Sequence, residues 1–343
     1  MSKIFVGLSG GVDSAVSAAL LQREGHDVVG AFIKIWNPDF LECTWKQDRI
    51  DAMRVCVSLG IPFREIDLSQ EYMRGVVDDM IATYRAGRTP NPDVLCNRHI
   101  KFGAFRQWAQ ANGAEMIATG HYAQTDGRHL SRAVDAAKDQ SYFLYRLTSD
   151  DLAKTRFPIG HLPKSQVRAL ARKFDLPVSQ KPDSQGLCFV GDVSIPEFLS
   201  RYIQLEKGPV LDSEGATVGE HDGAASYTIG QRHGIRVPGI NYVTAIDIAS
   251  NTLIVSEHKE DTLSRAAILT DVHWIGEVPE SGAEVSAQSR YHAAVARVTI
   301  SHENGTWRAS FAHPELLSPG QSVVFYDGDV CLGGGVVENV SQK

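Results

Sequence analysis

The sequence predicts an α/β protein in which a domain with an open parallel sheet is followed by two small β domains. The first observation is an alternation of apolar strand patterns with amphipathic helix patterns up to about residue 145. The second is a change, after about residue 205, to short alternating strands with turn dipeptides. A chain of 343 residues is long enough for two or three domains. We expect their bounds at residues 1–204, with a basic helical segment at 145–200, and at 205–260 and 261–343.

The composition is that of an ordinary globular protein. Hydrophobic residues make up 43% and charged residues 22%, which excludes fibrous and wholly disordered chains. No apolar run is long enough to span a membrane, and residues 4–8 are too short for a signal peptide, so we expect a cytoplasmic protein without membrane contact. A net charge of −7 weighs against nonspecific coating of nucleic acid. The 5 cysteines include no C-x-x-C pair, which favours reduced thiols.

The first domain opens with a strand, a loop, a helix and a second strand. Residues 4–8 form a buried-strand pattern, Val12 begins a helix that Gly25 ends as a C-terminal cap, and residues 28–33 form the next strand. The rhythm then repeats, which is typical of a parallel sheet. We expect further helices at 49–59 and 101–110, and strands at 63–68 and 116–119.

Residues 145–181 are predicted to be short, basic and helical. We interpret this segment as a surface appendage that faces something anionic. A solvated charged face is the ordinary alternative, but here the basic excess is local within an acidic chain. Its basic residues are Arg146, Lys154, Arg156, Lys164, Arg168, Arg172, Lys173 and Lys181.

The C-terminal third is predicted to be β structure in two units that divide near residue 260. Asn304-Gly305 and Asp327-Gly328 are hairpin dipeptides between strand patterns. Trp307, Ala309 and Phe311 alternate onto one face, as in a small barrel or sandwich.

The loop Ser9-Gly10-Gly11-Val12-Asp13-Ser14 lies between the first strand and the first helix. Backbone N–H groups and the helix dipole can hold a polyphosphate there. The loop lacks the lysine of G-x-x-x-x-G-K-[ST] and does not fit G-x-G-x-x-G. A bare Gly-Gly turn with a serine cap is the alternative, but the complete hexapeptide in this setting favours phosphate binding.

The hexapeptide resembles the pyrophosphate loop of N-type ATP pyrophosphatases. These enzymes cleave ATP between its α and β phosphates to adenylate a substrate oxygen, and they share an open α/β sheet. The resemblance implies ATP as cofactor, with Asp13 and Ser14 near the pyrophosphate and its Mg²⁺. It places the nucleotide at Gly7, Leu8, Ser9, Gly10, Gly11, Val12, Asp13, Ser14, Ile33 and Gly120.

Two of the cysteines have settings that favour reactivity. Cys96 precedes an apparent helix and has Arg98, His99 and Lys101 close in sequence, which favours the thiolate. Cys188 lies in a loop before a helix that Ser194 and Glu197 would open. Burial as a small hydrophobe is the commonest alternative, and we accept it for Cys56 and Cys331. The role of Cys43 stays open.

Five spaced segments together resemble the tRNA-specific 2-thiouridylase family. The resemblance runs from the first strand to the C-terminus. Ile33 and Ile35 depart from the family, which usually has Met and Asn there. The segments are residues 91–97, 138–144, 184–189, 227–232 and 330–335.

The resemblance implies ATP-dependent 2-thiolation of the wobble uridine-34 in tRNAs for Lys, Glu and Gln. Cys188 would carry a persulfide supplied by a cysteine desulfurase or a sulfur-relay protein. Cys96 would be the second catalytic thiol, closing a transient disulfide with Cys188. Asp93, beside the base, is the candidate general acid or base; an Asx-type turn after Pro92 is an equal alternative from the residues alone.

The uridine must leave the stacked anticodon loop to reach such a pocket. The resemblance assigns tRNA contacts both around this pocket and in the β domains. Tyr291 could equally be half-buried filler of a barrel. The assigned residues are Asn91, Pro92, Asp93, His121, Lys138, Asp139, Gln140, Arg290, Tyr291 and Gln321.

Three other hypotheses remain open at this stage. The chain could be another pyrophosphate-loop ligase or amidotransferase acting on a small substrate. It could be a tRNA-binding module without catalysis, which would bind tRNA in a salt-sensitive way and release no AMP. Cys43, Cys96 and Cys188 could hold an iron–sulfur cluster, although no tight ligand spacing supports it, and we assign no metal-ligating residue.

Overall fold

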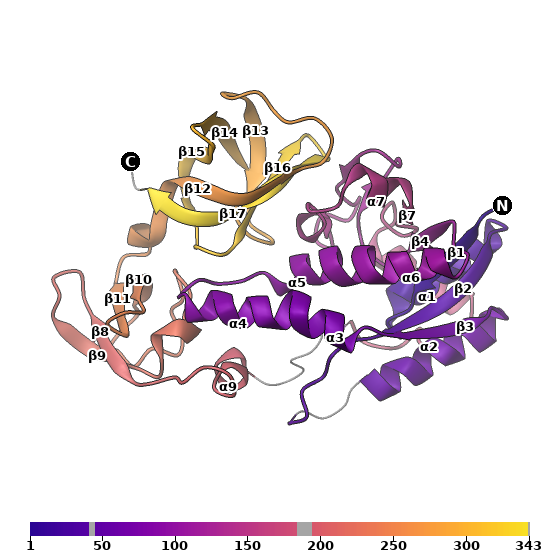
Figure 1. The fold of residues 1–343 in the computed structure, drawn as a ribbon, viewed down its shortest axis with the longest axis horizontal. Helices are drawn as coiled ribbons and strands as arrows, with labels where there is room; N and C mark the ends of the chain where they lie inside the picture. The colour runs from indigo at the N-terminus through magenta and orange to yellow at the C-terminus, as the bar shows by residue number, and fades with distance from the viewer. Residues whose placement is uncertain (41–44, 184–193, 342–343) are drawn as a thin grey trace.

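A computed structural model describes residues 1–40, 45–183 and 194–341. Figure 1 shows a helical domain with a parallel sheet, a small β domain and a β-barrel, in chain order. Within the described residues, no helix is both long and apolar enough to cross a membrane.

The first domain contains the predicted open parallel sheet, with the strand order β3-β2-β1-β4-β7. Every neighbouring pair in this sheet is parallel. The expected strands are confirmed to within a residue or two. Their bounds are Lys3–Gly7 for β1, Asp27–Lys34 for β2, Phe63–Asp67 for β3 and Met116–Ala118 for β4. The edge strand β7 (Thr155–Arg156) was not expected, because it lies in the segment predicted to be helical.

Helices cover both faces of this sheet because successive strand residues point to opposite sides. Ile4 and Val6 of β1 belong to a core with α1 (Val12–Arg23), α2 (Trp45–Leu59) and α8 (Lys164–Lys173). Phe5 packs into the opposite core, which two long helical runs cover. Gly25 adopts a φ of 87° directly after α1, as a C-terminal cap does.

The two long helical runs were predicted only in part. The first combines α3 (Ser69–Tyr72), η1 (Met73–Val77) and α4 (Asp78–Arg85). Its buried Tyr72, Val76, Met80 and Tyr84 recur every four residues, a helical signal that the sequence analysis missed. The second combines α5 (Pro92–Leu95), η2 (Cys96–Ala104) and α6 (Phe105–Ala111). The expected start at residue 101 is wrong, because Pro92 already occupies the first helical turn.

The basic segment after residue 145 is not an appendage, and this expectation is corrected. Strand β7 forms the edge of the parallel sheet, beside β4. Val167 and Ala171 of α8 are buried in the core that α1 shares, and Leu152 of α7 (Ser149–Ala153) is buried in the opposite core. The apolar residues that lie between the charged ones are buried in the two cores, and they therefore fix the segment against the sheet.

The central β domain follows α9 (Ile195–Leu199), which Ser194 caps by accepting a bond from the Glu197 amide, as expected. Its sheet has the order β10-β11-β8-β9. A short 3₁₀ turn, η5 (Lys259–Thr262), leads to the barrel near the expected division. The strands are Gly208–Leu211 for β8, Thr217–His221 for β9, Tyr242–Asp247 for β10 and Thr252–Ser256 for β11.

The C-terminal barrel closes because its first strand pairs with its last, β12 with β17. Ala309 and Phe311 face its interior, as predicted. Asn304 and Gly305 both have positive φ in the expected β14–β15 hairpin, whereas residues 328 and 329 make the β16–β17 turn. The strands are Leu263–Trp274, Glu284–Gln288, Ala296–Glu303, Thr306–Leu316, Ser322–Asp327 and Val330–Ser341 for β12 to β17.

A hairpin from the first domain extends the barrel sheet. It consists of β5 (Gln124–Thr125) and β6 (Leu130–Ser131), and β6 pairs with β17 at Val330 and Cys331. Its Asp126-Gly127 turn was a readable signal that the sequence analysis missed. The first domain and the barrel therefore share one continuous sheet.

Candidate active site

The phosphate loop lies between β1 and α1, as predicted. Gly11 is the N-cap of α1, and no side chain of the described residues caps it, so its first N–H groups can bind an anion. Inside the loop, Ser14 Oγ accepts from the Ser9 amide at 3.2 Å. Gly10 has a φ of 74°, and a Cβ there would lie 2.4 Å from the carbonyl oxygen of Asp48. Only glycine fits this position.

Gly120 and Ile33 lie beside this loop, and their contact with a nucleotide stays a prediction. A Cβ on Gly120, just after β4, would lie 2.6 Å from the Ser14 amide nitrogen. The Ile33 side chain of β2 would lie 3.7 Å from a Cβ on Gly7. Ile35, the other departure from the family, packs against the core on the Phe5 side of the sheet.

Asp13 in the first turn of α1 is held by two partners. Lys164 Nζ lies 2.7 and 2.8 Å from its two carboxylate oxygens. Tyr122 donates its hydroxyl to Asp13 Oδ1 at 3.0 Å. The ammonium of Lys164, whose side chain is 14% exposed, therefore lies beside the loop that would hold the pyrophosphate.

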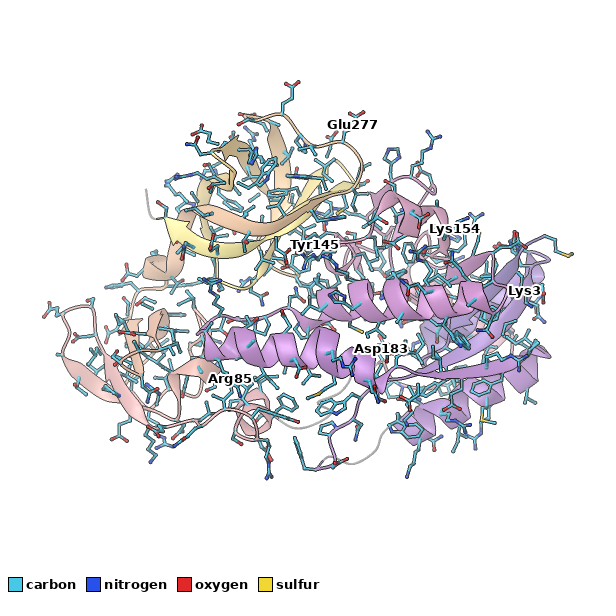
Figure 2. All side chains as sticks on the ribbon, in the orientation of Figure 1. Lys3, Arg85, Tyr145, Lys154, Asp183 and Glu277 are labelled. Atoms are coloured by element: carbon cyan, nitrogen blue, oxygen red, sulfur yellow. The ribbon has the colours of Figure 1, made fainter. Side chains whose placement is uncertain are left out.

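A second carboxylate, Asp183, gathers three cations beside Asp13. Lys138 and Lys164 each lie 2.9 Å from it, and Arg168 donates to it as well. Burial raises the pKa of Asp183, but bonds from these lysines outweigh burial and hold it well below the usual range. Figure 2 marks Asp183. Lys181, two residues earlier, pairs with Asp48 and Asp51 of α2 at 2.7 Å each.

Cys96 is 6% exposed and lies inside the second helical run. The expectation that it precedes a helix is wrong, because the helix starts at Pro92, four residues earlier. Cys96 therefore lies about one turn from the N-terminus, where the helix dipole has already weakened. Its position is fixed by a rigid element.

Asp93 lies in the first turn of this helix. Burial raises the pKa of its carboxyl group, and the positive charge of Lys101 opposes that effect. A carboxyl group with a raised pKa is suited to proton transfer near neutral pH. The role of Asp93 as acid or base stays a prediction. Asp93 follows Pro92 within a helical turn, so the predicted alternative of an Asx-type turn after Pro92 is replaced by helix.

His121 is a buried neighbour of this site rather than a surface group. Lys101 Nζ lies 3.3 Å from its Nε2, and Thr119 Oγ1 lies 2.8 Å from its Nδ1. Because a lysine ammonium can only donate, Nε2 accepts and Nδ1 carries the proton. Burial holds the pKa of His121 well below its ordinary value. The neutral imidazole therefore orients Lys101.

The segment before Asp93 is held by both β domains. Gln321 of the barrel donates to the carbonyl oxygens of Thr89 and Pro90 at 3.0 and 2.8 Å. Thr89 Oγ1 lies 2.9 Å from Thr228 Oγ1 of the central β domain. Gln321, which was predicted to contact tRNA, thus uses its amide nitrogen for bonds inside the protein. These bonds hold the backbone that leads to Asn91.

Tyr291 of the barrel also reaches this site. Its ring lies 4.4 Å from that of Phe143, between centroids. Burial raises the pKa of Tyr291, and the carboxylates of Asp139 and Asp93 raise it further. The ring packs against the core of the first domain. Tyr291 is thus not filler of the barrel interior. Arg290 beside it is exposed.

Residues 138–140 have two different roles. Lys138 forms an ion pair, whereas Asp139 and Gln140 form hydrogen bonds inside the protein. Lys138 pairs with Asp183, as described. Asp139 is 6% exposed and accepts from the Ala133 amide at 2.9 Å and the Ser141 hydroxyl at 2.8 Å. Gln140 accepts from the Tyr122 amide at 3.0 Å. Asp139 and Gln140 therefore shape the loop that presents Lys138.

The cysteines expected to be inert are buried, as predicted. Burial raises the pKa of the Cys56 thiol to about 11 and that of Cys331 to about 12, so neither forms a thiolate at neutral pH. Cys188 and Cys43 lie outside the described residues. Among the described residues, no group of three metal-binding side chains is found.

The sequence analysis did not assign Lys164, Asp183 and Tyr122 to the site. Lys164 belongs to the basic segment that had been singled out, and Asp183 precedes one of the five family segments. Lys164 and Tyr122 bond to Asp13 across 151 and 109 residues, and Asp183 bonds to Lys164, so no local pattern reveals these contacts.

Three family models match consecutive parts of the chain. A tRNA methyl transferase HUP domain matches residues 2–192, and a tRNA methyl transferase PRC-barrel domain matches residues 196–257. An aminomethyltransferase beta-barrel domain matches residues 264–337. These models correspond to the three sheets of the structure.

Curated relatives match over nearly the full chain. A tRNA-specific 2-thiouridylase MnmA of Burkholderia pseudomallei is 45% identical over 99% of this chain and 94% of the relative. The enzyme of the same name from Burkholderia thailandensis is 46% identical over 98% and 93%.

Among solved structures, a U34-tRNA thiolase NcsA from Methanococcus maripaludis is 19% identical, with a TM-score of 0.37 over 54% of this chain and 60% of that one. This likeness is too distant to bear on function.

Proposed function

Because the chain belongs to the tRNA-specific 2-thiouridylase family, we propose that it uses ATP to replace the C2 oxygen of wobble uridine-34 by sulfur in tRNAs for Lys, Glu and Gln. The observation that carries this proposal is a match of 45% identity over 99% of the chain, which includes the loop, the Cys96 helix and both β domains. The products would be 2-thiouridine, AMP and pyrophosphate.

The first step would be adenylation at the phosphate loop. The uracil O2 attacks the α-phosphorus of ATP, an O–P bond forms, and the bond to the β-phosphate breaks to release pyrophosphate. The uncapped N-terminus of α1 and the Lys164 ammonium suit the leaving pyrophosphate, because both offer positive charge. Asp13 would hold Mg²⁺, which neutralises phosphate charge when it is bound.

Asp93 would take the proton from uracil N3 as O2 attacks and return it after sulfur transfer. The raised pKa of its carboxyl group supports this role, because the protonated form is then easier to reach near neutral pH. Asn91 and Pro92 would line the pocket for the flipped base, with Tyr291 on the barrel side.

The second step would transfer sulfur. The terminal sulfur of a persulfide on Cys188 attacks C2, a C–S bond forms, and the C2–O bond breaks to expel AMP. The Cys96 thiolate then attacks the Cys188 sulfur, so the electrons of the persulfide S–S bond pass to the thiouridine sulfur. A thiol reductant reopens the resulting Cys96–Cys188 disulfide, and a cysteine desulfurase or a sulfur-relay protein reloads Cys188.

The remaining tRNA contacts would come from Lys138 beside the loop and from exposed Arg290 on the barrel. Arg290 is exposed, and Lys138, which pairs with Asp183, is still 41% exposed, so both cations can reach phosphate groups. His121, Asp139, Gln140 and Gln321 would act by positioning, since each makes bonds inside the protein.

The test combines purified protein, ATP, Mg²⁺, a persulfide donor and an unmodified tRNA-Lys transcript, followed by digestion and mass spectrometry. We expect 2-thiouridine together with AMP. A parallel reaction with S-adenosylmethionine in place of ATP and the donor checks for methylation, which the names of two family models suggest. AMP without 2-thiouridine would leave adenylation in place and reject the sulfur step. Absence of both products would favour a small-substrate ligase or a binding module.

A further inference from the structure

Residues 179–183, the anchored segment, lie between α8 and the part of the chain that contains Cys188. They follow Leu176 and Val178, which are buried in the core that α1 and α8 share. None of residues 179–183, all of which the structure describes, is buried or belongs to a helix or strand. Polar bonds rather than apolar packing therefore hold the anchored segment in place. Figure 2 labels its last residue, Asp183.

Arg168 of α8 bonds to the anchored segment at three places. Its guanidinium group donates to the carbonyl oxygens of Ser179 and Lys181 and to the carboxylate of Asp183. A guanidinium group can do this because its donors form a rigid planar fork, whereas a lysine ammonium is a single point charge. Arg168 therefore fixes the course of the backbone in addition to pairing with a carboxylate.

Lys164 connects the anchored segment to the phosphate loop. It lies one turn before Arg168 on the same face of α8. Its ammonium group lies 2.7 Å from the carboxylate of Asp13 and 2.9 Å from that of Asp183. One face of α8 thus holds both the first turn after the phosphate loop and the end of the anchored segment.

Lys181 makes a second connection to the phosphate loop. Its ammonium group pairs with Asp48 and Asp51 of α2 at 2.7 Å each. The carbonyl oxygen of Asp48 lies so near Gly10 that a Cβ there would be 2.4 Å from it. The two connections together hold the anchored segment beside the loop that would bind the pyrophosphate.

The length of chain after Asp183 makes this position relevant to sulfur transfer. Cys188 follows Asp183 by five residues, and a chain of that length spans at most about 18 Å. The place where Asp183 is held thus limits how far a sulfur atom on Cys188 can be from the phosphate loop.

We propose that Arg168 is a positioning residue for sulfur transfer. By anchoring residues 179–183, it keeps the sulfur of Cys188 within reach of the adenylated uridine, so that sulfur reaches the uridine before water does. This inference rests on the proposed function, because it requires Cys188 to carry the sulfur.

Folding stability is a weaker explanation for these bonds. The side chains of Arg168 and Asp183 are 23% and 27% exposed, and ion pairs that reach solvent contribute little to stability. The buried Leu176 and Val178 instead secure the chain just before the anchored segment. We therefore expect the protein to fold when Arg168 is replaced.

The test measures how much AMP is released for each 2-thiouridine formed. When sulfur is out of reach, water hydrolyses the adenylated uridine to uridine and AMP, and further cycles consume ATP without forming product. Both products are quantified by mass spectrometry, with the persulfide donor and a tRNA-Lys transcript, for wild type, Arg168→Met, Arg168→Lys and Arg172→Met. Arg172, exposed one turn later on α8, provides the matched control.

We expect about one AMP for each 2-thiouridine in wild type and Arg172→Met, and a ratio about tenfold higher in both Arg168 variants. Arg168→Lys keeps the positive charge beside Asp183 but loses the fork that binds two carbonyl oxygens, so it should not restore the wild-type ratio. Thermal unfolding verifies that each variant is folded, and Arg168→Lys serves alone if Arg168→Met does not fold.

The inference is overturned if Arg168→Lys has the wild-type ratio, because the charge alone would then be sufficient. It is also overturned if AMP and 2-thiouridine fall in equal proportion, because Arg168 would then serve adenylation. Failure of the proposed function is distinguishable from both outcomes, because the wild-type protein would then form no 2-thiouridine.

Discussion

The phosphate side and the base side of the candidate site are built in opposite ways. The phosphate side rests on one continuous loop, residues 9–14, whose conformation is supported by the strand before it and the helix after it. The base side depends on three domains, because Thr89 and Pro90 are held by Thr228 and Gln321. The proposed nucleotide site therefore belongs to the first domain, whereas the proposed base site depends on bonds from both β domains.

The two sides also differ in the electrostatic surroundings of their carboxyl groups. On the phosphate side, Lys164 pairs with both Asp13 and Asp183. Burial raises the pKa of Asp183, but the bonds from Lys138 and Lys164 hold it well below its usual range. On the base side, Asp93 is desolvated, which favours its neutral form. The first arrangement suits the binding of a charged group, and the second suits the movement of a proton.

The largest expected effect on activity is that of replacing the thiol of Cys96 on the base side. Cys96→Ser should reduce 2-thiouridine formation by about a thousandfold or more, because serine cannot resolve a persulfide. AMP formation in the first turnover should persist, since Cys96 lies on the helix of Asp93 and not in the phosphate loop. Quantifying both products by mass spectrometry checks this. Cys56→Ser, a buried thiol elsewhere, is the control and should retain activity, whereas equal activity of the two variants would reject the two-thiol mechanism.

The second largest effect on activity is expected for Lys164 on the phosphate side. Lys164→Met keeps the length of the side chain but removes the charge beside Asp13, and should lower the rate of AMP formation by about a hundredfold. The KM for tRNA should change little if the two sides are separate. Lys173→Met, exposed in the last turn of the same helix, is the matched control. A large rise in the KM for tRNA with an unchanged adenylation rate would contradict the division into two sides.

A smaller effect is expected at the domain junction. Gln321→Ala leaves the carbonyl oxygens of Thr89 and Pro90 without their donor and loosens the approach to Asn91. We expect kcat/KM for tRNA to fall about tenfold while the KM for ATP stays constant. Initial-rate measurements with each substrate varied in turn test this, and Asn339→Ala, exposed on the barrel, is the control. An equal loss for ATP would mean that the barrel also supports the phosphate side.

The same contrast explains how much could be predicted from the sequence. The parallel sheet, the phosphate loop and the barrel follow local patterns, and the structure agrees with them. Lys164 and Asp183 were not assigned, because the bonds of Lys164 to Asp13 and to Asp183 depend on how α8 packs against α1. Cys96 was expected before a helix, because the helix was expected to start at residue 101; Pro92, a residue type favoured in the first helical turn, starts it instead.

The smallest effects are on stability, and they should have opposite signs on the two sides. Burial raises the pKa of Asp93, so its charged form destabilises the folded protein at neutral pH, and this cost disappears as the pH falls below the usual carboxyl range. Asp93→Asn should therefore raise the midpoint of thermal unfolding at neutral pH, by at most a few degrees, while 2-thiouridine formation falls.

Asp183 is the counterpart on the phosphate side. Its pKa is lowered, so its charged form stabilises the fold at neutral pH, and that stabilisation is lost as the pH falls toward the lowered pKa. Asp183→Asn should lower the midpoint at neutral pH by a similar amount. Thermal unfolding of both variants and wild type from neutral to acidic pH measures the two differences, and both should shrink with acidification. If Asp93→Asn were destabilising at neutral pH instead, its carboxylate would be a structural partner, and the proton-transfer role of the base side would have to be assigned to another group.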